Sequence, residues 1–140
     1  MIPVRELTAA TAAALCACAV EVCLRTLPLP RTARIFGVSL RTTGGSTVAP
    51  RQAVLGRRGR LQARAVQRVM RHWPFDDTCL RHALVAGHRL RRFGPELVIG
   101  VTKVDGAVRA HAWLEFDSGI YDPLGAAPAY HPLTSSPPEG

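Results

Sequence analysis

The sequence lacks several features that would assign it to a class at once. Cysteine occurs only four times and without paired spacing, which excludes a small disulfide scaffold. Aromatic residues make up 6 % and charged residues 20 % of the chain, whereas 47 % is hydrophobic. A fully disordered chain is excluded, because the apolar content is too high and the charge too low. No run of about 20 apolar residues is free of both charge and proline, so the sequence predicts no membrane span.

Negative charge is scarce in one part of the chain. Residues 31–92 hold fourteen arginines and two aspartates, a local charge of +12, whereas the remainder holds four cations and eight acids, or −4. Such asymmetry favours an acidic partner: nucleic acid, an anionic membrane surface or an acidic peptide. A solvated, arginine-rich surface would explain the same composition without a partner. Nucleic-acid binding through residues 51–71 is an alternative function, although no aromatic residues are interleaved with these arginines.

The N-terminal stretch, residues 4–27, is rich in alanine and predicts a helix. Its apolar stripe at helical spacing comprises Leu7, Ala10, Ala14, Cys18 and Val22. A secretory signal is the alternative for this stretch, but acidic residues flank the alanine-rich run. Three cysteines lie on the helix, and we expect them to be buried as small hydrophobic residues: Cys16, Cys18 and Cys23.

Residues 28–60 show no clear period. They hold five glycines and three prolines, and we expect an arginine-rich connector there, with a loop at residues 42–46. A second amphipathic helix is predicted over residues 61–73. A third helix is predicted to begin at Asp76-Asp77-Thr78, whose side-chain oxygens can cap free N–H groups, and to end at Gly94.

The last third of the chain predicts a small sheet. Strands are expected over residues 97–104, 107–116 and 120–122, and the first two are joined by Asp105-Gly106, a strong hairpin signal. We therefore expect a single domain in three parts. These are an N-terminal helix and connector (1–60), a core (61–125) and a frayed tail (126–140).

Cys79 is the first candidate for catalysis. It lies in the first turn of the third predicted helix. The partial positive charge at a helix start favours a thiolate, and the free N–H groups there can donate hydrogen bonds to an oxyanion. A lone cysteine in this position is usually structural, so the assignment needs a base in a suitable context.

His111 supplies that context. It lies in the middle of the strand predicted over residues 107–116, between two alanines that leave the imidazole room. Trp113 shares its face of the strand and is expected to form a wall of the substrate-binding site. A cysteine at a helix start, followed by a histidine on an antiparallel hairpin, has the order of a papain-like nucleophile–base pair.

A third side chain should hold the imidazole in one tautomer. The chain contains no asparagine, so this residue must be acidic or a glutamine. Asp122 is the best placed, with Glu115 and Asp117 as alternatives. A two-residue turn at residues 118–119 would leave Asp122 roughly 13 Å from His111 along the sheet, and a three-residue loop would put it on the wrong face. A bulge, a wider loop or strong twist would then have to bring them together.

A metal site is a weaker possibility. Cys79 and His82 at i, i+3 could share an ion with His72 or His88, but only two ligands have plausible spacing. We expect neither a metal nor a cofactor.

Four stretches of the sequence, taken together, resemble a known family. They are Thr78–Leu84 (TCLRHAL), Leu97–Val101 (LVIGV), Ala110–Glu115 (AHAWLE) and Tyr121-Asp122. In this combination they resemble the lasso-peptide leader peptidases, which are transglutaminase-like cysteine proteases of ribosomal peptide biosynthesis. The resemblance covers about residues 61–125.

The resemblance implies both a fold and an activity. The fold would be α+β and papain-like or transglutaminase-like, with N-terminal helices and then a catalytic helix packed on a small antiparallel sheet. The activity would be a cysteine endopeptidase that removes the leader from a lasso precursor peptide, with Cys79 as nucleophile, His111 as base and Asp122 as orienting residue. A transglutaminase or acyltransferase on the same fold is the alternative, since it would form the same thioester.

The resemblance also implies partners. A small leader-recognition protein, the RiPP recognition element, would deliver the precursor, and an ATP-dependent macrolactam cyclase would act after cleavage. We expect the enzyme to be cytoplasmic and not to bind nucleic acid.

Overall fold

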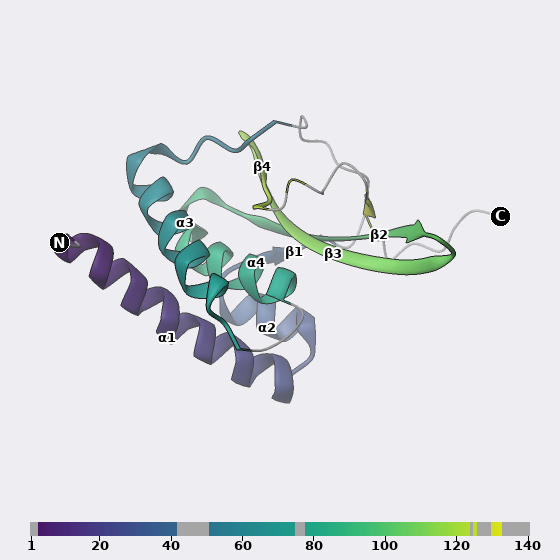
Figure 1. Cartoon of the computed structure of the whole chain (residues 1–140), viewed down its shortest axis with the longest axis horizontal. Helices are drawn as coiled ribbons and strands as arrows, with labels where there is room; N and C mark the ends of the chain where they lie inside the picture. Colours follow the sequence, from purple (N-terminus) through teal and green to yellow (C-terminus); the bar gives the residue numbers. More distant parts are fainter. Residues whose placement is uncertain (1–2, 42–50, 75–77, 124, 126–129, 133–140) are drawn as a thin grey trace.

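Helices from the N-terminal part of the chain cover one face of a small sheet formed mainly by the C-terminal part (Figure 1). This computed structural model describes residues 3–41, 51–74, 78–123, 125 and 130–132. The helices are α1 (Val4–Thr26), α2 (Leu29–Ile35), α3 (Gly56–Arg71), α4 (Thr78–Arg89) and the 3₁₀ turn η1 (Arg91–Phe93). The α+β class expected from the sequence is confirmed.

Helix α1 has the predicted span but buries a different face. Leu7 and Val22, expected on the buried stripe, are 58 % and 62 % exposed. Small residues are buried instead, among them Ala9, Ala13 and Ala17. The reason is that α1 packs against α3 and α4, and alanine lets helices approach closely. Of the three cysteines on α1, Cys16 is buried, Cys23 is half-buried and Cys18 is exposed.

By length and apolar composition alone, α1 is also able to cross a bilayer, which the sequence prediction did not anticipate. The same properties occur in core helices and in signal sequences. In this protein the helix contributes Ala13, Ala17 and Val20 to the main hydrophobic core, and Leu15 on its other side is 69 % exposed.

The predicted connector contains regular structure. It holds α2, the short strand β1 (Ser39–Leu40) and the first turn of α3, which begins at Gly56 rather than at residue 61. Three other predicted features lie wholly or largely outside the described residues: the loop at 42–46, the aspartates before α4 and the tail after 125. Within that tail region, residues 131–132 form strand β5 (His131–Pro132).

The sheet has the order β1–β2–β3–β4, with β2 at Glu96–Val104, β3 at Ala107–Phe116 and β4 at Gly119–Tyr121. The strand β5 pairs with β2. We expected an antiparallel sheet, but β1 runs parallel to β2, so the sheet is mixed. A two-residue strand 57 positions upstream of its partner leaves no periodic signal in the sequence.

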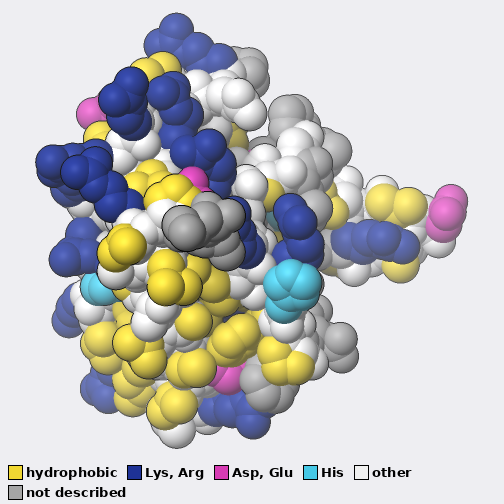
Figure 2. Space-filling model, turned by 60° about the vertical axis from the view of Figure 1, so that its left-hand side comes forward, with side chains coloured by type: hydrophobic (Ala, Val, Ile, Leu, Met, Phe, Trp, Pro, Cys, Tyr) yellow, Lys and Arg dark blue, Asp and Glu magenta, His cyan; other side chains and the backbone are white. Residues whose placement is uncertain are grey.

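The hairpin of β2 and β3 follows the prediction closely. Asp105 and Gly106 have φ values of 51° and 81°, the left-handed backbone that a two-residue turn of this kind requires. The tip of the hairpin extends beyond the body of the molecule, and residues 103–110 are exposed (Figures 1 and 2). The arm is therefore held by strand pairing rather than by packing.

The two faces of β3 contact different parts of the protein. Leu114 points into the main core, where α4 contributes Leu84. Trp113 lies on the other face with Val98 in a small second cluster. The base of β3 is therefore buried on both faces, which makes it a rigid support for His111.

Candidate functional site

Cys79 is the second residue of α4, as the sequence predicted, and its side chain is partly exposed. The helix packs on β2 and β3. N–H groups in the first turn of a helix have no intrahelical acceptor, so they are available to an oxygen atom bound beside the thiol. The position suits a nucleophile that acts on a carbonyl group.

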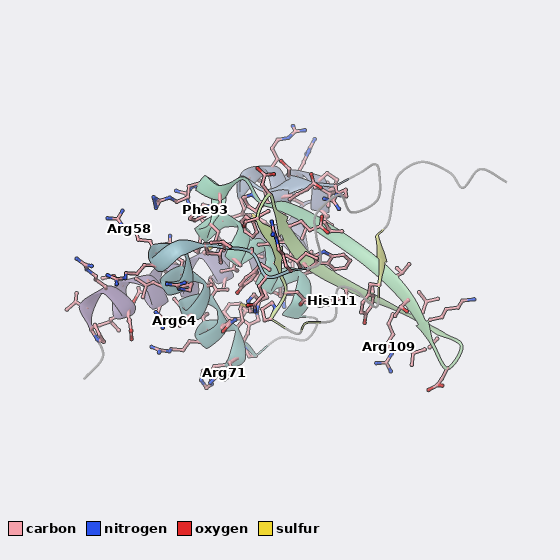
Figure 3. The ribbon with its side chains drawn as sticks, turned by 90° about the horizontal axis from the view of Figure 1, so that it is seen from above. Arg58, Arg64, Arg71, Phe93, Arg109 and His111 are labelled. Atoms are coloured by element: carbon pink, nitrogen blue, oxygen red, sulfur yellow. The ribbon has the colours of Figure 1, made fainter. Side chains whose placement is uncertain are left out.

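His111 is fixed by a carboxylate. Its Nε2 lies 2.9 Å from Oδ2 of Asp122, and the two side chains are 5 % and 3 % exposed. A carboxylate can only accept, so Nε2 is the donor and Nδ1 is left free to take a proton. The ring of Trp113 stacks on the imidazole of His111 (Figure 3), with 5.8 Å between the ring centres. The centre of the Tyr130 ring lies 5.2 Å from the centre of the same imidazole.

The turn before β4 explains how Asp122 reaches His111. Phe116 pairs with Gly119, so the turn consists of residues 117–118 and begins one residue earlier than we expected. Continuing this register puts Asp122 level with Trp113, on the face of His111 and two residues from it, about 7 Å along the strand. Both registers considered from the sequence were wrong, and no bulge is needed.

A distant segment fixes that turn. A Cβ on Gly119 would lie 2.4 Å from the carbonyl oxygen of Arg51, so only glycine fits there. The Ile120 N–H donates to the same oxygen, and Ser118 accepts a hydrogen bond from the N–H of Val54 through its hydroxyl oxygen. Residues 51–54 therefore determine the register of β4, which the local sequence could not reveal.

A small cavity of about 80 Å³ connects these residues. Its lining residues are Cys79, His82, Ala83, His111, Ala112, Trp113, Tyr121, Asp122 and Pro123. The three residues predicted to be catalytic, and Trp113, thus line one cavity although they come from α4, β3 and the end of β4.

His82 and Tyr121 are site residues whose role the sequence did not show. The Tyr121 hydroxyl lies 3.0 Å from Nε2 of His82. Burial lowers the pKa of His82 to about 4, against an opposing effect of the Asp122 charge. His82 is thus neutral at pH 7 and is hydrogen-bonded to the hydroxyl, while burial also raises the pKa of Tyr121. The i, i+3 spacing from Cys79 was the available signal, but it suggested only a metal.

Glu115 and Asp117, the alternatives to Asp122 as the residue that orients His111, have other contacts. Glu115 is 1 % exposed, forms an ion pair with Arg41 and accepts a hydrogen bond from the indole Nε1 of Trp113 at 3.3 Å. It therefore helps to fix the ring that stacks on His111. Asp117 is exposed in the turn. In the described part of the chain, no three His, Cys, Asp or Glu side chains are close enough to hold a metal ion.

One of the comparisons with known proteins identifies a family. The family model of the transglutaminase-like superfamily matches residues 23–135, more than half of the chain. No curated protein and no solved structure matches. The matched range contains α4, β3 and β4 with all the residues that line the small cavity. The superfamily generally contains enzymes of the cysteine-protease and transferase type. The chain belongs to the transglutaminase-like superfamily.

Proposed function

We propose that the protein is a cysteine endopeptidase that removes the leader peptide from a lasso-peptide precursor in the cytoplasm. The observation that carries the catalytic part is the His111–Asp122 hydrogen bond in a cavity that Cys79 also lines. The substrate class rests on the resemblance of four stretches of sequence to the leader peptidases.

The reaction would proceed through a thioester. Nδ1 of His111 takes the thiol proton while Sγ of Cys79 attacks the scissile carbonyl carbon. N–H groups at the start of α4 stabilise the oxyanion, and the leaving amine receives the proton from His111. Water, activated by the same imidazole, then hydrolyses the thioester and restores the thiol. Asp122 holds the imidazole throughout and stabilises its charged form.

Two partners complete the proposal. A leader-recognition protein would present the precursor, because the small cavity offers room for little more than the residues around the scissile bond. An ATP-dependent macrolactam cyclase would use the released core peptide. The arginine-rich connector (28–60) and the helix predicted after it (61–73) are the proposed docking surface for the recognition protein.

Cleavage of a precursor peptide in the presence of its recognition protein tests the catalytic proposal. Cys79→Ala should abolish cleavage without changing the thermal unfolding midpoint, because the nucleophile is lost from a partly exposed position. Cys18→Ala is the matched control, since Cys18 is also accessible but lies on α1. Mass spectrometry of the products gives the rate.

Two outcomes would contradict the proposal. One is that Cys79→Ala cleaves at a rate comparable to the parent. The other is that, with an amine such as glycine methyl ester present, the amide forms faster than the acid, which would identify an acyltransferase. Iodoacetamide gives a check that needs no substrate, because an activated Cys79 should be alkylated faster than Cys18 at neutral pH.

A further inference from the structure

A second and much larger cleft lies away from the candidate active site. Its volume is about 730 Å³, and it forms where α1, the first turns of α3 and η1 meet. Arg58 and Phe93, which both line the cleft, lie at one end of the molecule, and His111 lies further along it (Figure 3). The volume is within the range of about 300–1,000 Å³ that is usual for ligand sites.

Five arginines line this cleft: Arg5, Arg58, Arg89, Arg91 and Arg92. No acidic residue is among the lining residues that the structure describes. The ion pairs found in the described ranges use other arginines, so none of these five is neutralised by a carboxylate there. Cationic side chains are thus gathered in a concave site, where their mutual repulsion would be relieved by an anionic ligand.

The guanidinium of Arg89 has a fixed orientation. Its Nε and Nη2 donate to Oε1 of Gln62 at 3.1 Å and 3.0 Å. The amide holds the guanidinium without cancelling its charge, and the N–H groups of Nη1 remain for a ligand. A pre-oriented guanidinium loses less conformational entropy when it pairs with a carboxylate.

The cleft also has an apolar part, formed by Ala9, Ala12, Leu61, Leu90 and Phe93. A Cβ on Gly59 would lie 2.6 Å from the Cβ of Leu55 and 3.4 Å from the Phe93 ring, so Leu55 requires the glycine and the ring lies in ordinary contact range of α3. The guanidinium of Arg92 lies 5.7 Å from the centre of the same ring. Cations next to an apolar surface match a ligand that carries both carboxylates and apolar side chains.

We propose that this cleft binds an acidic segment of a peptide, with its carboxylates on the arginines and its apolar side chains against Leu61 and Phe93. Arginine pairs with carboxylates through two parallel hydrogen bonds. Single-stranded nucleic acid is usually bound by several exposed aromatic rings on which successive bases stack. The described lining of this cleft holds a single aromatic ring, that of Phe93, which is 37 % exposed and lies beside Arg92. The cleft therefore suits a peptide better than a nucleic acid. This site is separate from Cys79, so the inference does not rest on the proposed catalytic function.

Fluorescence anisotropy with the full chain tests the inference. The probe is a fluorescein-labelled eight-residue peptide of alternating glutamate and leucine, and the control peptide has glutamine at each glutamate. The triple variant Arg58→Gln, Arg91→Gln, Arg92→Gln should weaken binding of the acidic probe at least about tenfold. The matched variant Arg31→Gln, Arg34→Gln, Arg71→Gln removes the same charge from exposed positions outside the cleft, and should change the Kd less than about twofold.

Thermal unfolding of each variant checks that the fold is retained. The inference is overturned if the acidic probe does not bind, if the glutamine peptide binds equally well, or if both triple variants lose the same affinity. It is also overturned if oligothymidylate binds more tightly than the peptide and loses affinity only in the cleft variant, which would assign the cleft to nucleic acid. Cys79→Ala should bind the acidic peptide with the same Kd as the parent. Peptide binding in the cleft can then be tested whether or not the proposed catalytic function of Cys79 is correct.

Discussion

His111 is held by a carboxylate at Nε2 and by two aromatic rings, so the imidazole has little freedom to turn. A base that is oriented before the substrate binds needs no reorganisation during the reaction. The indole N–H of Trp113 donates a hydrogen bond to the buried Glu115, so Glu115 helps to fix the ring that stacks on the imidazole. Each of these contacts acts on the geometry of the base rather than on the substrate.

Asp122→Ala should therefore lower kcat by about a hundredfold or more while the fold is kept, since the imidazole loses its tautomer and orientation. Asp122→Asn should lower kcat by no more than this factor, because an amide oxygen can still accept a hydrogen bond from the N–H of Nε2. Asp117→Ala, at an exposed carboxylate in the same turn, serves as the control. Steady-state cleavage kinetics measure the effect, and near-normal kcat in Asp122→Ala would remove the residue from the mechanism.

The sequence predicted Cys79 and His111 from local context, because a helix start and a hairpin are both signalled by nearby residues. The position of Asp122 was only partly predictable. Its register depends on a contact between Gly119 and Arg51, which are far apart in the chain. The sequence suggested His82 only as a metal ligand. Its hydrogen bond with Tyr121 could not be predicted, because it joins α4 to β4 across 39 residues of the chain.

At the scale of elements, Glu21 joins α1 to α4. Its buried carboxylate accepts from Arg81 of α4 and from Arg25 of its own helix. The hydrogen bond from Arg81 is the largest cause that lowers the pKa of Glu21, and it outweighs the effect of burial. The unfolded chain therefore binds a proton at a higher pH than the folded protein does. The pair stabilises the fold above the ordinary pKa of 4.5, and this contribution is lost as the pH falls through the lower folded value.

Glu21→Gln should accordingly reduce the free energy of unfolding at pH 7 by about 3 kcal/mol, because Arg81 loses its buried partner. The difference from the parent should shrink as the pH falls below 4.5. Urea unfolding at several pH values measures it. Glu6→Gln is the control, since Arg68 is 53 % and Glu6 36 % exposed and the two are 4.0 Å apart, and it should cost less than about 1 kcal/mol. A difference that stays constant into acid would contradict the assignment.

Sequence periodicity failed to predict two features of these elements: which face of α1 is buried, and the short elements α2 and β1. Helix α1 has apolar residues on more than one side, and its periodicity could not tell which side is buried. The neighbouring helices α3 and α4 decided it, because they pack on the face that carries Ala13, Ala17 and Val20. The short elements α2 and β1 were missed for a different reason. Seven and two residues are too few to show a period, and β1 forms only against a strand far along the chain.

At the scale of the whole molecule, cations dominate, with a net charge of +8. Arg57, Arg58 and Arg60 are all exposed at the start of α3. If this surface receives the recognition protein with its bound leader, association should be faster in dilute salt. The Debye length shrinks from about 30 Å at 0.01 M to about 8 Å at 0.15 M, so the association rate should fall about tenfold over this range.

Reversal of these three arginines to glutamate should remove most of the salt dependence, as measured by biolayer interferometry against the recognition protein–leader complex. Reversal of Arg5, Lys103 and Arg109, which are exposed outside residues 28–73, is the charge-matched control. Equal effects of the two triple variants would mean that only net charge matters. An unchanged rate in the parent at both salt concentrations would remove α3 from the interface.

The short length of β4 has a consequence for the protein in concentrated solution. It pairs with β3 only from Leu114 to Phe116, and no described strand covers the same edge from Ala107 to Trp113. An uncovered edge is a template for a strand of another copy, and the exposed Arg109 in its middle opposes such pairing by repulsion. Because salt weakens that repulsion, the solubility of the protein should depend on the ionic strength of the buffer, and the arm that supports His111 would be the first part to self-associate.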